Sequence, residues 1–219
     1  AARPQTEAEA DRMLEESDRL ADRIQARMER EGPDADYGKI LEEELEHRRR
    51  ERGEEPLTPE QEAERAAWIE ELNRAAEESA PWSPDEPEPR HPLSERAFEL
   101  SVRLHQEVKG RGWLPRDASP EHPVAELVAA VMKAGAKLAG ALNGEDDPPP
   151  VDFCGQSIAR LKRAANYLGD ALLAADACAE ERLTAPDWLA EVRREIADLA
   201  RETDTVIGEL RERLERGWD

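Results

Sequence analysis

The chain has 219 residues, with 31 Lys or Arg against 52 Asp or Glu and a formal net charge of −21. This length allows one large domain or two small ones, folded without a stabilising metal or disulfide. The strong negative charge repels phosphate groups, so it disfavours nucleic acids and anionic membranes and favours basic or neutral protein partners. No stretch approaches the roughly 18 consecutive apolar residues of a membrane span, and the charged start of the sequence is unlike a signal peptide. We therefore expect no membrane association and a cytoplasmic location.

Residues 1–79 are predicted to form an acidic helical region of about three helices. The first helix begins at the capping box Thr6-x-x-Glu9 and ends at a Gly-Pro pair. The second covers about 36–52 and has only a narrow apolar side. The third begins at Thr58, which is followed by a proline at the first helical position and by a returning glutamine.

The composition changes at residues 80–92, where five prolines oppose helix formation and favour an extended spacer. Residues 1–90 contain 14 Lys or Arg and 28 Asp or Glu, whereas the remaining residues contain 17 and 24. We therefore place a domain boundary at this proline-rich linker, with the more acidic part of the chain before it.

Four more apolar helices are predicted in residues 93–219. The first is expected at about 93–109, and the second at 123–142 with an alternative start at Ser119. The third is expected to start at Asp152, and the fourth to start at Thr184 and to be about 30 residues long. Connections are short and each helix has an apolar side, which favours an antiparallel up-and-down four-helix bundle. Because no period-two pattern occurs, the predicted fold class is all-α: this bundle with an additional N-terminal helical region.

The last predicted helix carries apolar residues at alternating steps of three and four over three heptads. Such a seam is typical of a helix that pairs with another helix, so we interpret it as a surface for self-association. The candidate interface residues are Trp188, Leu189, Val192, Ile196, Leu199, Val206 and Leu210.

Three stretches of the C-terminal region follow a pattern of polar, small and apolar positions found in a known family. They are Ser94–Leu100, Leu127–Gly144 and Ile158–Asp170. With them, residues 93–217 resemble the four-helix-bundle proteins encoded in intervening sequences of ribosomal RNA genes, whose relatives include the accessory variability proteins of retroelements. The resemblance implies a homo-oligomer, often a pentamer, that binds proteins or nucleic acid without catalysis. This chain is acidic where the retroelement relatives are basic, so we expect an unknown protein partner and not nucleic acid.

Cysteines and histidines show no catalytic spacing. Cys154 and Cys178 fall in one predicted helix, about 36 Å apart, so they cannot form a disulfide with each other and are predicted to be buried thiols. His91 and His122 each precede a proline, and we expect them to act as local caps or surface groups. We therefore predict no catalytic residue, no metal ligand and no cofactor.

The leading hypothesis is a non-catalytic interaction or scaffold protein that self-associates through its bundle helices and recruits a partner through its acidic N-terminal helices. The alternative is a metal-dependent all-α enzyme similar to nucleotide pyrophosphohydrolases, in which carboxylates on facing helices hold Mg²⁺. A single Glu44-x-x-His47 pair also has the spacing of a bundle metal ligand set, but a di-metal site requires two such pairs. The carboxylates assigned to the alternative are Glu42, Glu43, Glu46 and Asp170.

Overall fold

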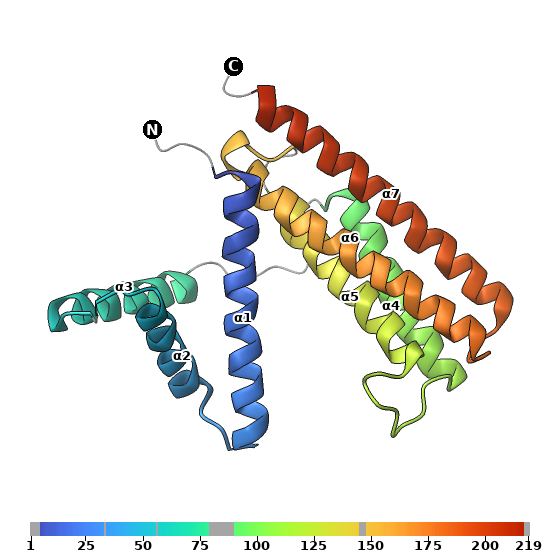
Figure 1. The fold of residues 1–219 in the computed structure, drawn as a ribbon, viewed down its shortest axis with the longest axis horizontal. Helices are drawn as coiled ribbons and strands as arrows, with labels where there is room; N and C mark the ends of the chain where they lie inside the picture. Colours follow the sequence, from blue (N-terminus) through green and yellow to red (C-terminus); the bar gives the residue numbers. More distant parts are fainter. Residues whose placement is uncertain (1–4, 33, 56, 79–89, 145–147, 217–219) are drawn as a thin grey trace. The chain divides into compact units, whose positions relative to one another are not determined.

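The computed structural model describes residues 5–32, 34–55, 57–78, 90–144 and 148–216, and these residues form seven α-helices and no strand. The helices are α1 (Glu7–Glu31), α2 (Tyr37–Glu51), α3 (Pro59–Glu78), α4 (Pro92–Arg111), α5 (Pro123–Leu142), α6 (Val151–Glu180) and α7 (Pro186–Arg216) (Figure 1). The predicted all-α class is confirmed for this part of the chain. Within it, no helix has the length and apolar character needed to cross a bilayer. The proline-rich linker predicted at 80–92 lies outside the described residues except for its last three.

Local sequence signals place several helix ends correctly. In the first capping box, the backbone N–H of Thr6 donates to Glu9 Oε2 at 3.0 Å, and the N–H of Glu9 donates to Thr6 Oγ1 at 3.3 Å. The same reciprocal pair joins Thr58 and Gln61 at the start of α3. The predicted cap at Asp152 is wrong, because α6 already begins at Val151 and Asp152 lies in its first turn. There its negative charge still suits the positive end of the helix dipole.

The chain divides into two compact units. The large unit comprises Ala1–Arg12 and Pro89–Asp219, and the small unit comprises Met13–Glu88. Helix α1 therefore begins in the large unit and continues into the small one. Residues 5–12, which the sequence pattern assigns to the N-terminal region, make contacts with the helices after the linker.

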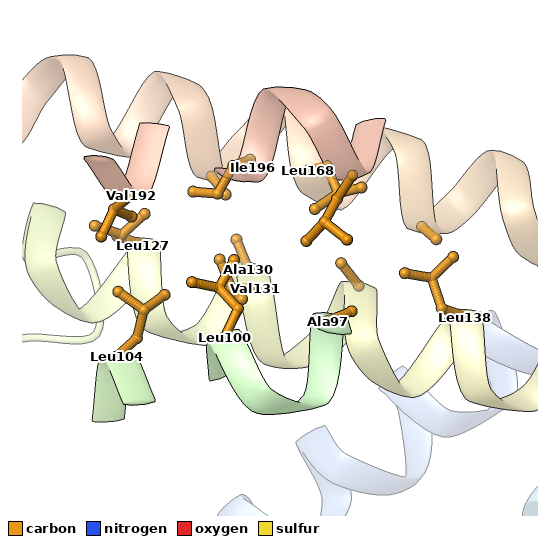
Figure 2. Packing of buried hydrophobic residues seen from close by; sticks show 14 of the residues in the cluster. Ala97, Leu100, Leu104, Leu127, Ala130, Val131, Leu138, Leu168, Val192 and Ile196 are labelled. Atoms are coloured by element: carbon orange, nitrogen blue, oxygen red, sulfur yellow. The ribbon is translucent and has the colours of Figure 1, made fainter. Parts of the chain in front are cut away.

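Helices α4 to α7 of the large unit share one hydrophobic core. Helix α5 packs against α4 and α6, α6 packs against α7, and α4 also contacts α7. Figure 2 shows Leu104 of α4, Val131 of α5 and Ile196 of α7 within this core, all of them buried. At Gly135 a Cβ atom would lie 3.6 Å from the carbonyl oxygen of Ala97, so the two backbones approach closely there.

The small unit has a much smaller core between α1 and α2. Of the side chains that the structure describes there, Leu20, Ile24 and Ile40 are buried in its hydrophobic cluster. Ion pairs flank these residues, with Arg27 Nη2 donating to Glu43 Oε2 at 2.7 Å. The contact between α1 and α2 is therefore a short apolar strip bordered by charged side chains.

Candidate functional site

The interface residues predicted on the last helix lie on α7, where they face the core of their own chain. Trp188, Leu189, Val192, Ile196, Leu199 and Leu210 are buried in the hydrophobic cluster of the large unit, and Val206 packs against it from a partly buried position. A heptad pattern indicates that a helix packs on others but not whether those belong to the same chain. Contact with a second copy requires side chains that this packing leaves exposed.

The carboxylates of the alternative enzyme hypothesis are divided between the two units. Glu42, Glu43 and Glu46 lie on α2 in the small unit, whereas Asp170 lies on α6 in the large one. The hydrogen bond from Arg27 lowers the pKa of Glu43, so this carboxylate is already paired with a cation. Among the described residues, no three or more His, Cys, Asp or Glu side chains gather in a way that could hold a metal ion.

The large unit exposes apolar side chains along the contact between α4 and α5. Phe98 and Val102 of α4 are 52% and 37% exposed, and Met132 of α5 is 52% exposed. The two helices touch where Gly135 meets the backbone of Ala97 and Phe98, and Met132 lies one helical turn before Gly135. We call Phe98, Val102 and Met132 the seam patch.

The small unit has an open groove between α1 and α2, with a volume of about 660 Å³. Tyr37 of α2 lines the groove and is 55% exposed. The other apolar residues of the lining are Leu20, Ala21, Ile24, Met28 and Leu41. We call this feature the α1–α2 groove.

The first two turns of α1 dock on α6 and α7 within the large unit. Glu7 accepts two hydrogen bonds from Arg211, one from Nε at 2.9 Å and one from Nη2 at 2.7 Å. The ammonium of Lys162 lies 3.0 Å from Glu7 Oε1 and also pairs with Asp11. We call residues 5–12 the N-terminal anchor, because two cations from two different helices hold it.

Small residues let this anchor lie close to α6. A Cβ atom at Gly155 would collide with the carbonyl oxygen of Gln5. Ala159, one turn further along α6, is fully buried, and Ala10 of the anchor is 1% exposed, although neither belongs to a hydrophobic core cluster. Close packing on small residues therefore holds the anchor in place, in addition to the ion pairs.

The ion pairs fix the charge states of the anchor. The hydrogen bond from Arg211, together with the bond and charge of Lys162, lowers the pKa of Glu7 from 4.5 to about 2. Hydrogen bonds to Asp11 and Glu7 raise the pKa of Lys162, and the bond to Glu7 raises that of Arg211. At neutral pH Glu7, Lys162 and Arg211 are therefore ionised, and their ion pairs are fully formed.

No family model, curated protein or solved structure matches this chain. The resemblance to the ribosomal RNA intervening-sequence family therefore stays a prediction.

The N-terminal anchor was not predicted from the sequence. The available signal was the pair Gly155 and Ala159, four residues apart on α6 and off the apolar stripe that contains Ile158 and Leu161. Small residues at that spacing form a shallow strip on which a second helix can lie. Nothing in the local sequence, however, identifies the start of the chain as the segment that occupies it.

The two cysteines are buried, and two of the four histidines act as helix caps. Cys154 and Cys178 are both buried free thiols, as predicted, and burial raises the pKa of Cys178 to about 11. Burial likewise raises the pKa of Cys154. His91 and His122 cap α4 and α5, with each Nδ1 accepting a backbone hydrogen bond at 3.2 Å. Thiols that stay protonated are poor nucleophiles.

Proposed function

We propose that the protein is a non-catalytic interaction or scaffold protein that self-associates through the large unit, while its acidic N-terminal helices bind a protein partner. The seam patch supports the first part, because it places three exposed apolar side chains along adjoining helices. Covering such a patch removes apolar surface from water, the main favourable term in association. The proposal includes a cytoplasmic location, where thiols such as Cys154 and Cys178 stay reduced.

We also propose that α4 to α7 form the antiparallel up-and-down four-helix bundle expected from the sequence. Each of these helices packs on the next one along the chain and the first contacts the last, which supports that arrangement. Cross-links that join the start of α4 to the end of α5 are the expected result. Cross-links that join the starts of both helices contradict the antiparallel order.

The absolute mass in solution tests self-association. Light scattering after size-exclusion chromatography is expected to give a multiple of the 24.6 kDa chain mass, and the family resemblance favours a pentamer. A variant carrying Phe98→Gln, Val102→Gln and Met132→Gln is expected to shift towards the mass of one chain. Glutamine removes the apolar contact area and keeps a good helix propensity.

A matched control separates the seam patch from general surface hydrophobicity. Leu173 lies on α6 outside the seam patch and is 69% exposed, so Leu173→Gln is expected to keep the wild-type mass. Circular dichroism of all variants is expected to show unchanged helix content. A wild-type protein that stays a single chain at every concentration contradicts self-association.

A further inference from the structure

The α1–α2 groove has the length and lining of a site for a short helix. Along α1 its lining runs from Ser17 to Glu29, thirteen residues that extend over about 18 Å or a little more than three helical turns. Leu20, Ile24 and Met28 repeat every four residues along this wall, and Tyr37 and Leu41 of α2 form the opposite wall. An amphipathic helix presents apolar anchors at the matching intervals i, i+4 and i+7.

The charge around the groove is negative. Residues 13–32 and 34–55, which comprise most of α1 and all of α2, contain 15 Asp or Glu and 9 Lys or Arg. Two of these arginines are held by carboxylates across the α1–α2 contact: Arg27 Nη2 lies 2.7 Å from Glu43, and Arg23 Nη1 lies 3.3 Å from Glu51. Glu29 lies in the groove lining itself. The net field therefore attracts cationic side chains and repels acidic helices and phosphate groups.

We propose that the α1–α2 groove binds a basic amphipathic helix of a partner protein. The apolar side of that helix covers Leu20, Ile24 and Tyr37, and its Lys and Arg side chains face the carboxylates of the small unit. This inference deepens the proposed function, since it rests on the chain being an interaction protein and states the chemistry of its partner. Among the described residues of the small unit, the hydrophobic cluster buries three side chains, so the added apolar contact also stabilises the pairing of α1 with α2.

Binding of a designed peptide to the full chain tests the inference. The probe is a fluorescein-labelled helical peptide built from Leu and Lys, with Leu on one side only, and the readout is fluorescence anisotropy. A peptide of the same composition in scrambled order is the first control, because it keeps the charge and loses the apolar side. The helical peptide is expected to bind at least tenfold more tightly than the scrambled one. Equal binding of the two peptides overturns the groove assignment.

Two alanines on α1 provide matched variants. Ala21 lines the groove, whereas Ala26 is exposed on the same helix but does not line it. Ala21→Arg inserts a bulky cation into the site and is expected to weaken peptide binding about tenfold or more. Ala26→Arg makes the same change in net charge and is expected to keep the wild-type affinity. Equal weakening by both variants overturns the proposal in favour of non-specific attraction.

The seam-patch variant distinguishes failure of this inference from failure of the proposed self-association. The triple glutamine variant at Phe98, Val102 and Met132 leaves the groove intact, so it is expected to bind the peptide like the wild type. If the protein is a monomer and binds the helical peptide, self-association is contradicted and the groove proposal is supported. An oligomer that does not discriminate between the two peptides contradicts the groove and leaves self-association in place.

Discussion

Gly155 has no side chain, and this allows the backbone at Gln5, 150 positions earlier in the sequence, to pack directly against α6. The carbonyl of Gln5 occupies the space that a methyl group at residue 155 needs. The backbone N–H of Ala10 then donates to the carbonyl oxygen of Thr6 at 3.0 Å, which continues the helix through the anchor. Close backbone approach is one of the few conditions in which glycine inside a helix is favourable.

The substitution Gly155→Ala is expected to displace the N-terminal anchor. Because the collision is with a backbone carbonyl, moving a side-chain tip cannot relieve it. Hydrogen exchange measured by mass spectrometry is expected to become faster in residues 7–12 while the core of α6 stays protected.

A second glycine of the same helix is the control for that change. At Gly169 an added Cβ atom would have no neighbouring atom within 4 Å, so Gly169→Ala is expected to stabilise α6 by about 0.5–1 kcal/mol. Unchanged exchange of residues 7–12 in the Gly155→Ala protein contradicts the assigned close contact.

The depressed pKa of Glu7 predicts a loss of anchoring in acid. The folded-state pKa of about 2 lies below the ordinary value of 4.5, so the carboxylate stabilises docking fully above pH 4.5 and loses this effect as the pH falls towards 2. Amide protection of residues 8–12, corrected for the intrinsic exchange rate, is expected to fall over that range. In a Glu7→Gln variant the protection is expected to be lower at neutral pH and to vary less with acid. Identical pH profiles for the two proteins contradict the role of this carboxylate.

Helices α2 and α6 differ strongly in burial. Ile40 is the only buried residue of α2, whereas α6 has buried residues along its whole length. Local opening requires little loss of apolar contact in the first case and much in the second. The amides of α2 are therefore expected to exchange well before those of α6.

The substitution Ile40→Ala tests how far α2 depends on one side chain. Removal of a buried isoleucine costs about 2–5 kcal/mol, a large amount for a cluster in which the described part of the chain buries Leu20, Ile24 and Ile40. Hydrogen exchange is expected to show loss of protection in α2 and unchanged protection in α6. Leu41→Ala is a suitable control, because Leu41 is only partly buried and is expected to cost less. Retained protection of α2 in the Ile40→Ala protein contradicts this account.

Helix positions were predictable from the sequence because their signals are local. The reciprocal bonds of Thr6 with Glu9 depend on residues three positions apart, and Gly32, Gly53 and Gly112 adopt the positive φ angles that end α1, α2 and α4. Local signals do not, however, determine which helix an apolar stripe packs against. The seam through Val192 and Ile196 is equally compatible with a partner helix in the same chain or in another copy, and in this structure it faces the chain's own core.

Across the whole molecule, the sequence was least informative where the interacting residues are furthest apart. Glu7 and Arg211 are separated by 204 residues, and neither belongs to a motif that points to the other. The α1–α2 groove was also missed, since it depends on how two helices pack and not on either helix alone. The negative charge, by contrast, was visible in the composition and now serves to define the chemistry of the expected partner.

The end of α4 and the start of α7 meet through two indole rings, which gives the large unit an optical signal of its own. The ring centroids of Trp113 and Trp188 are 4.5 Å apart with a tilt of 57°, and Trp188 Nε1 donates to Glu107. Transitions of two chromophores at such a separation couple, so their circular dichroism in the near ultraviolet reports on this junction. Opening of the junction is thus visible in a spectrum of the unlabelled protein, without any introduced dye.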